Sequence, residues 1–223
     1  MMHAFPVVSR CLSGRLMATL LLLLSLWTGM ASAANTTLLV MGDSLSAAYG
    51  IERQAGWISL LRQRLGDEVK VVNASISGET TSGGATRLHK LLRQHAPDIV
   101  LIELGGNDGL RGLSPKQMRH NLSSMIEASQ KADAEVLLVG IEIPPNYGQA
   151  YARAFKAVYR DLAEQYDVPL VPFLLDGVAL EEDLMQDDGI HPTAEAQPRM
   201  LENVWPELKA LLPEQTQERM ASQ

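Results

Sequence analysis

A serine, a histidine and an aspartate in this chain have the types and spacing needed for acyl transfer. Ser44 directly follows an apolar run, Leu38 to Met41, within the stretch VMGDSLSAAYG. His191 lies in DDGIHP, three residues after Asp188. A serine hydroxyl needs a base to remove its proton, and histidine suits that task because its pKa lies near neutrality. Ser44 is therefore the predicted nucleophile, His191 the base and Asp188 the acid that orients the imidazole, in preference to Asp187.

Acyl transfer also needs hydrogen-bond donors for the negative oxygen of the tetrahedral intermediate. Gly78 lies in the stretch NASISGE, and Asn107 lies in GGND. Taken singly, Ser44 is typical of a helix N-cap, Gly78 of a turn and Asn107 of an Asx turn. Together, the backbone N–H groups of Ser44 and Gly78 and the side-chain amide of Asn107 predict an oxyanion hole. Loss of one such donor typically raises the barrier by roughly 3–4 kcal/mol.

The elements that must position these residues alternate between strands and helices. Nearly continuous apolar runs predict five strands buried on both faces, at Leu38–Met41, Val69–Val72, Ile99–Leu104, Val136–Gly140 and Pro169–Phe173. Between and after them, apolar residues at helical spacing predict helices around residues 57–65, 88–92, 118–126, 155–162 and 201–211. Such alternation indicates a parallel sheet with helices on both faces. The polar stretches follow the first three strands, so they should meet at the carboxyl edge of the sheet, where ligands bind.

Four segments together resemble the blocks of the GDSL, or SGNH, hydrolase family. They are Gly42-Asp43-Ser44-Leu45, Gly78, Gly105-x-Asn107-Asp108 and Asp188-x-x-His191, in the order of the family. The resemblance runs from about Thr37 to Leu212 and is closest to periplasmic multifunctional members with acyl-CoA thioesterase, lysophospholipase and arylesterase activities. It implies a flavodoxin-like three-layer α/β/α sandwich with about five parallel strands and hydrolysis of carboxylic esters and thioesters. It implies no metal and no cofactor.

The two ends of the chain differ from the central domain, which we predict at residues 34–213. Residues 1–33 are typical of a signal peptide, with Arg10 and Arg15 as the basic start, an apolar core from Leu16 to Leu26, and Ala31-Ser32-Ala33 as the cleavage site. An uncleaved membrane anchor is the alternative. The polar residues 214–223 predict a disordered tail.

Composition restricts the partners of the mature chain. Removal of residues 1–33 takes away two arginines and no acid, which leaves 17 basic and 26 acidic side chains and a net charge of −9. Such a surface argues against nucleic acid and anionic lipid headgroups as main partners. The only cysteine, Cys11, leaves with the signal peptide, so the mature chain forms no disulfide. We expect a monomeric, periplasmic or secreted enzyme without a stable membrane anchor, acting on acyl esters, thioesters or lysophospholipids.

The stretch GLRGLS, which follows Asp108, is a candidate cover for an acyl chain. Gly109 and Gly112 could act as hinges, while Leu110 and Leu113 could contact the acyl group. Gly109, Leu110 and Leu113 are therefore candidate substrate-binding residues. The alternative is an ordinary loop before the next helix.

Three other functions compete with the reading above. A metal-dependent phosphoesterase would take its ligands from Asp43, Asn73, Asp108, Asp188 and His191, but a two-metal site usually gathers more histidines and carboxylates. A periplasmic binding protein would need no serine, histidine and aspartate in catalytic order. Within the same family, a carbohydrate acetyl esterase is the alternative to an acyl thioesterase and lysophospholipase.

Overall fold

A computed structural model describes residues 1–3 and 36–221 of the chain. Every described strand and helix lies within residues 36–221. Apart from residues 1–3, the predicted signal peptide and its cleavage site lie outside the described residues.

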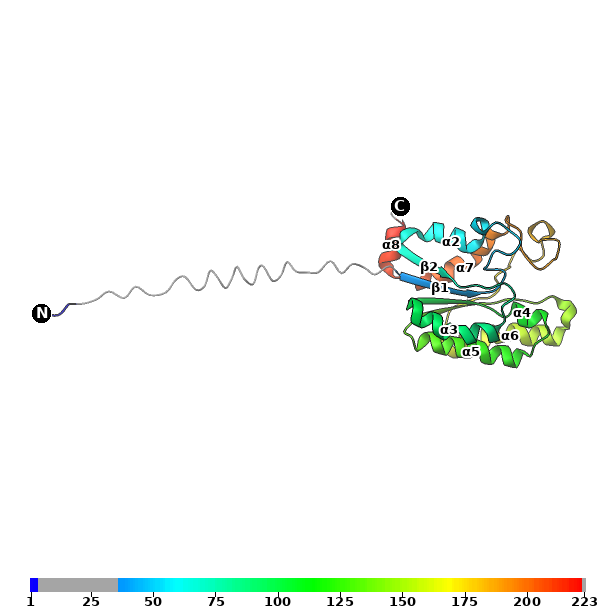
Figure 1. Ribbon diagram of the computed structural model, residues 1–223, viewed down its shortest axis with the longest axis horizontal. Coiled ribbons are helices and arrows are strands. Elements are labelled where there is room, and N and C mark those ends of the chain that lie inside the picture. The colour runs from blue at the N-terminus through cyan, green and yellow to red at the C-terminus, as the bar shows by residue number, and fades with distance from the viewer. Residues whose placement is uncertain (4–35, 222–223) are drawn as a thin grey trace. The chain divides into compact units, whose positions relative to one another are not determined.

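The five predicted strands form one sheet in which every pairing is parallel (Figure 1). The strand order is β2-β1-β3-β4-β5. The strands are β1 (Thr36–Gly42), β2 (Val69–Asn73), β3 (Ile99–Glu103), β4 (Glu135–Val139) and β5 (Leu170–Val171). β5 is shorter than predicted because prolines at both ends, Pro169 and Pro172, cannot donate a ladder hydrogen bond.

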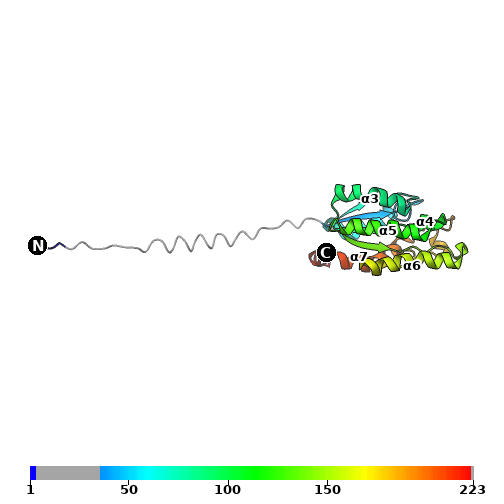
Figure 2. The same ribbon diagram turned by 90° about the horizontal axis from the view of Figure 1, so that it is seen from below.

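Helices cover both faces of the sheet, which confirms the predicted three-layer α/β/α sandwich (Figures 1 and 2). α2 (Trp57–Leu65) and α7 (Gln197–Leu211) pack together on one face. On the other face, α5 (Pro115–Gln130) packs between α3 (Thr81–His95) and α6 (Gln149–Tyr166). Shorter helical segments are α4 (Gly106–Leu110), η1 (Arg53–Ala55), η2 (Gly66–Glu68), η3 (Pro145–Tyr147) and η4 (Glu182–Leu184).

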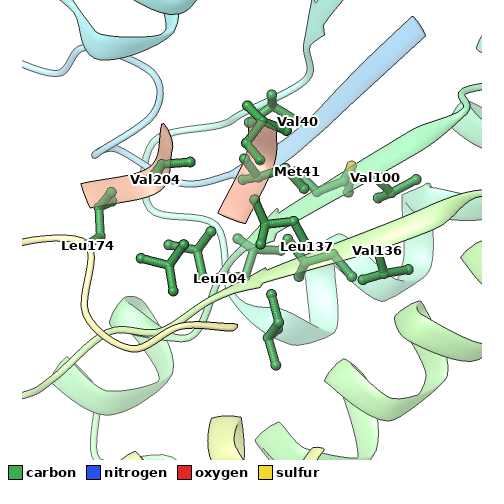
Figure 3. Packing of buried hydrophobic residues seen from close by; sticks show 14 of the residues in the cluster. Val40, Met41, Val100, Leu104, Val136, Leu137, Leu174 and Val204 are labelled. Carbon is green, nitrogen blue, oxygen red and sulfur yellow. The ribbon is translucent and has the colours of Figure 1, made fainter. Parts of the chain in front are cut away.

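The hydrophobic core lies on both sides of the central strands, as the unbroken apolar runs predicted. Every residue of β1 and of β3 is buried. Figure 3 shows side chains of these strands and of β4 packed together, with Leu174 and Val204 closing the cluster on the α7 side. Because β1 and β3 are buried along their whole length, their carboxyl ends are rigid supports for the polar residues that follow them.

The strand order places the switch point of the fold between β1 and β3. From β1 the chain moves outward in one direction to β2, and it then returns to build β3, β4 and β5 on the other side. In open sheets of this kind, the crevice for ligands lies beyond the carboxyl ends of the strands at the switch point. Ser44 follows β1 and Asn107 follows β3, so the topology brings these two predicted residues to that crevice.

The prediction of a disordered polar tail is wrong for the residues that the structure describes. Glu214–Ala221 form α8, directly after Pro213 ends α7. Thr216 is buried and Met220, four residues later, packs against the core, so one face of this short helix is anchored. Arg219 also pairs with Glu68 of η2. Tertiary contact therefore stabilises a segment whose polar composition suggested disorder.

Candidate active site

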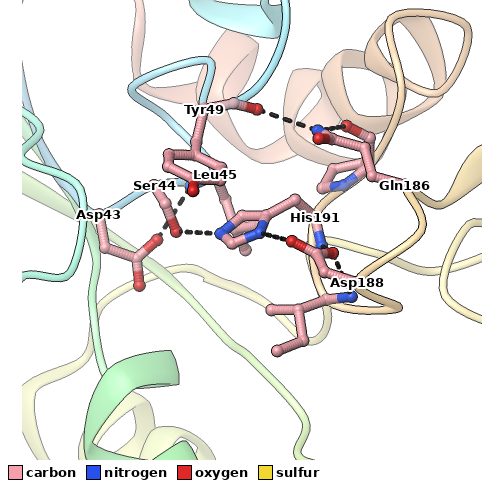
Figure 4. Close-up of polar contacts among 9 residues, drawn as sticks. Asp43, Ser44, Leu45, Tyr49, Gln186, Asp188 and His191 are labelled. Atoms are coloured by element: carbon pink, nitrogen blue, oxygen red, sulfur yellow. Dashed lines mark hydrogen bonds and ion pairs between the residues drawn. The ribbon is translucent and has the colours of Figure 1, made fainter.

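The structure brings Ser44, His191 and Asp188 into one hydrogen-bonded chain (Figure 4). The Ser44 Oγ lies 2.9 Å from His191 Nε2, and His191 Nδ1 lies 2.6 Å from the Asp188 Oδ2. Because an ionised aspartate only accepts hydrogen bonds, Nδ1 carries the ring proton and Nε2 is left to accept the serine proton. This is the arrangement that a general base needs before it activates a serine hydroxyl.

Ser44 sits on a turn that begins where β1 ends. The Leu45 N–H donates to Asp43 Oδ1 at 3.0 Å, and the Ala47 N–H donates to the Asp43 carbonyl at 3.0 Å. From β2, the Asn73 side chain donates to the Ser46 carbonyl at 2.8 Å. Short-range hydrogen bonds and one from the neighbouring strand therefore hold the turn.

His191 and Asp188 belong to a loop that is held mainly by its own backbone. Asp188 Oδ1 accepts hydrogen bonds from the Ile190 and His191 N–H groups, both at 2.9 Å. Desolvation raises the pKa of Asp188, but the hydrogen bonds from the His191 ring and these two N–H groups outweigh it and lower the pKa to about 2. Asp188 is thus ionised at neutral pH, as the orienting role requires. Asp187 is exposed.

Two residues that the sequence did not single out connect the histidine loop to the serine turn. Gln186 uses both hydrogens of its side-chain amide, donating to the carbonyl of Tyr49 and to that of Pro192, each at 2.9 Å. The Tyr49 ring lies over the imidazole, with the ring centroids 4.4 Å apart. Gly50 has φ +74°, and a Cβ there would collide with Gln186 at 2.1 Å. This bridge spans 137 residues of sequence, so local patterns could not reveal it.

An open hollow of about 750 Å³ lies beside the histidine, lined by Tyr49, Gly50, Gln186, Asp187 and Asp188. Two of these residues, Tyr49 and Asp188, contact the His191 ring.

The predicted oxyanion donors lie at the ends of β1, β2 and β3. Asn107 Nδ2 donates one hydrogen to Asp43 Oδ2 at 3.0 Å, which leaves its second hydrogen available. Gly78 has φ +79°, a conformation that favours glycine, and its carbonyl accepts from Arg111 at 2.9 Å. Within residues 36–221, neither the Ser44 nor the Gly78 N–H donates to another protein group.

A pair of buried acids lies under the serine turn. Asp43 is 2% exposed and Glu103, the last residue of β3, is fully buried. Burial raises the pKa of Asp43, and hydrogen bonds from Leu45 and Asn107 oppose the shift, leaving the pKa at about 6. Burial, together with the Asp43 charge, raises the pKa of Glu103 well above its usual range. Glu103 is the one acid within the otherwise apolar predicted strand Ile99–Leu104. An acid in a strand predicted to be buried could have indicated a special role, but it was not singled out in the sequence.

The stretch predicted as an acyl cover is tied down more firmly than a hinged loop would be. Gly109 lies inside α4, where a Cβ would come within 2.3 Å of Ile143, so packing explains this glycine better than hinge motion. Leu113 is 42% exposed. Tyr147 donates to the Leu110 carbonyl at 3.1 Å, and Tyr151 of α6 donates to the Leu113 carbonyl at 2.7 Å.

The candidate ligands of a metal-dependent phosphoesterase take part in separate hydrogen-bond networks. Asp108 accepts from the N–H and the hydroxyl of Thr81 at the start of α3, at 2.9 and 2.6 Å. Asp188 is engaged with His191, and Asn73 with Ser46. Across residues 36–221 no three His, Cys, Asp or Glu side chains gather as a metal site would require.

A three-layer α/β/α fold with a hydrogen-bonded Ser-His-Asp chain at the carboxyl edge of its sheet defines a serine hydrolase. Residues 40–198 match the sequence model of the GDSL-like Lipase/Acylhydrolase family, and the chain belongs to that family. The resemblance drawn from the four motifs is thereby confirmed.

Several relatives are similar over most of the chain. Esterase TesA of Pseudomonas aeruginosa is 55% identical over 81% of this chain and 91% of its own length. "Thioesterase 1/protease 1/lysophospholipase L1" of Escherichia coli is 50% identical over 75% of this chain and 80% of its own length. Among solved structures, the crystal structure of TesA has a TM-score of 0.78, with 54% identity over 79% of this chain and all of that one. An esterase EstA from Pseudoalteromonas, inhibited by monoethylphosphonate, has a TM-score of 0.75, with 42% identity over 79% of this chain and 98% of its own.

Proposed function

We propose that this hydrolase cleaves carboxylic esters and thioesters through an acyl-enzyme intermediate on Ser44. The proposed substrates are small acyl esters, acyl thioesters and lysophospholipids. The names of the relatives refer to activities on substrates of these classes. The observation that carries the proposal is the 2.9 Å contact between Ser44 Oγ and His191 Nε2, which is a nucleophile-to-base hydrogen bond.

The reaction follows from the positions of these groups. His191 Nε2 accepts the Ser44 proton as Oγ attacks the acyl carbon, and Asp188 steadies the imidazolium that forms. The N–H groups of Ser44 and Gly78 and the free hydrogen of Asn107 receive the oxyanion. The intermediate collapses when the C–O or C–S bond breaks and the leaving group takes the proton from His191. Water then releases the acid by the same sequence of transfers.

The decisive test is Ser44→Ala, assayed on p-nitrophenyl butyrate and by covalent labelling with a serine-directed phosphonate. We expect the variant to lose at least about 10³-fold in kcat and all labelling, since the nucleophile is gone. Ser82→Ala, an exposed serine of α3, is the matched control and should behave like the wild type. Butyrate hydrolysis by Ser44→Ala at the wild-type rate would overturn the proposal.

A substrate panel decides the acyl and leaving-group preference. Purified enzyme is assayed on acetyl to palmitoyl p-nitrophenyl esters, acyl-CoA, a lysophospholipid and an acetylated oligosaccharide. Activity on the oligosaccharide alone would favour the carbohydrate acetyl esterase. We further propose that Leu113 contacts long acyl chains. Leu113→Ser should then lower kcat/KM for palmitate by about 10-fold, from lost apolar contact, and leave acetate unchanged. An equal change on both esters would reject this contact.

We also propose that the enzyme is exported and monomeric. None of the described helices combines the length and apolarity that a membrane crossing requires. Expression of the full chain in a gram-negative host should yield a periplasmic product whose amino-terminal residue is Ala34, read by terminal sequencing. Sedimentation should give a mass of one chain. A membrane-bound, uncleaved product would favour the anchor alternative.

A further inference from the structure

Glu103 lies across the end of β1, below the turn that carries Ser44. Its Oε2 accepts a hydrogen bond from the Ser46 hydroxyl at 2.7 Å and one from the Asp43 N–H at 3.3 Å. Gly42 makes room for it, because a Cβ at that position would lie 2.7 Å from the same Oε2. The Glu103 side chain therefore binds the backbone before Ser44, at Asp43, and a side chain after it, at Ser46.

Asp43 connects Glu103 to the proposed oxyanion site by hydrogen bonds. The Asp43 N–H is bound by Glu103, and Oδ2 of the same residue accepts from Asn107 Nδ2 at 3.0 Å. Asp43 thus decides how the Asn107 amide is rotated and which of its two hydrogens faces the crevice. A shift of Asp43 would turn that amide away from the developing negative charge.

The chemistry of the pair favours a neutral Glu103. Its Oε1 has no hydrogen-bond partner in the described part of the chain, and a fully buried ionised carboxylate with one bare oxygen is costly. Asp43 has the Leu45 N–H and the Asn107 amide as donors, so it keeps the charge of the pair. The other ionisable groups acting on this pair are Asp108, His191 and Tyr159.

We propose that Glu103 is a positioning residue that, as a neutral acceptor, holds Asp43 so that Asn107 points its free amide hydrogen at the oxyanion. The inference rests on the proposed function, in which Asn107 is an oxyanion donor. It predicts that Glu103 affects kcat rather than KM, because it acts only when negative charge develops on the acyl oxygen.

The first test compares Glu103→Leu, which removes the acceptor, with Glu103→Gln, which keeps an oxygen for the Ser46 and Asp43 donors. On p-nitrophenyl butyrate we expect kcat to fall about 10-fold in Glu103→Leu with KM within about 2-fold, and Glu103→Gln to stay within about 3-fold of wild type. Glu135→Gln, an exposed glutamate at the start of β4, is the control and should change nothing. Wild-type kcat in Glu103→Leu, or equal losses in both Glu103 variants, would overturn the inference.

The second test is a double-mutant cycle with Asn107→Ala, which separates positioning from general damage to the fold. If Glu103 acts through Asn107, Glu103→Leu should cost less than about 2-fold once Asn107 is already removed. A full 10-fold loss in that background would mean that Glu103 does not act through Asn107. Should Glu103→Leu fail to fold, Ser46→Ala replaces it in the same cycle, because it deletes one of the two donors to Glu103.

Ser44→Ala distinguishes a failure of this inference from a failure of the proposed function. If Ser44→Ala is active, the proposed reaction at Ser44 is rejected. If Ser44→Ala is inactive but Glu103→Leu is fully active, only the positioning role of Glu103 is rejected.

Discussion

The two halves of the Ser-His-Asp chain are supported in opposite ways. Ser44 stands on buried polar groups, with Asp43 2% exposed and Glu103 fully buried at the ends of two central strands. His191 stands on a loop, and its partner Asp188 has a side chain that is 40% exposed. The serine half is therefore positioned by long-range burial and the histidine half by hydrogen bonds within a few residues, with Gln186 as the bridge between them.

Because of this difference, substitutions in the two halves should affect stability and catalytic rate differently. Changes on the exposed half should affect the rate while leaving the fold almost untouched, because few buried contacts are lost there. Changes on the buried half should affect both, since a desolvated acid that loses its partners destabilises the folded state.

The largest expected effect is that of Asp188→Asn on the exposed half. The amide cannot hold the Nδ1–H tautomer as a carboxylate does, so kcat on p-nitrophenyl butyrate should fall about 10³- to 10⁴-fold. The urea midpoint at neutral pH should fall only slightly, because the Asp188 side chain is 40% exposed and water screens the hydrogen bonds that stabilise its charge. Asp187→Asn, the adjacent exposed aspartate, is the control and should keep wild-type kcat. A loss below 10-fold in Asp188→Asn would show that the loop does not orient the base.

A second prediction concerns the pH dependence of stability on the buried half. The folded-state pKa of Asp43, about 6, exceeds the usual value of 3.8, so the folded state binds more protons between these values. The unfolding free energy contributed by this group should thus fall as pH rises from about 4 to about 7, by up to about 3 kcal/mol. Urea unfolding of wild type and Asp43→Asn across this range checks it. A constant difference between the two proteins would contradict the buried, protonatable Asp43.

Asp188 should show the opposite sign. Its folded-state pKa of about 2 lies below the usual value of 3.8, so its stabilising contribution is present above that value and is lost as pH falls toward 2. A comparison of wild type and Asp188→Asn between about pH 5 and 2 should show the two stabilities converging in acid. Convergence at higher pH instead would mean that the His191 and backbone donors do not hold the ionised form.

The smallest expected effect is at the bridge between the halves. Gln186→Ala removes a neutral hydrogen bond to Tyr49, which joins the histidine loop to the serine turn, and a second one to Pro192 within the loop, so kcat should fall about 3- to 10-fold. Gln63→Ala, on the exposed face of α2, should have no effect. If Gln186→Ala kept wild-type kcat, the backbone of the loop alone would set the Ser44–His191 distance.

Sequence patterns predicted the strands and the layers, and they indicated the residues that we propose carry the reaction. The strands followed from continuous apolar runs, and Ser44, Gly78, Asn107, Asp188 and His191 from residue types that complete one reaction. Patterns failed where a role comes from a distant partner. Sequence patterns assigned no role to Glu103 or Gln186. The composition of α8 is that of a polar tail, and only the structure shows that Thr216 is buried and that Met220 packs against the core.

The amino-acid sequence by itself determined which groups could perform the chemistry, because reactivity depends on side-chain type and on neighbours within a few residues. Only the tertiary structure decided that Ser44 and His191, 147 residues apart, meet within 2.9 Å. It also decided that an acid of β3 lies beneath the nucleophile. Glu103 lies there because β3 pairs with β1, and neighbouring parallel strands bring their carboxyl ends to one edge however far apart they are along the chain. His191 reaches Ser44 from the loop after β5, which the Gln186–Tyr49 hydrogen bond ties to the serine turn.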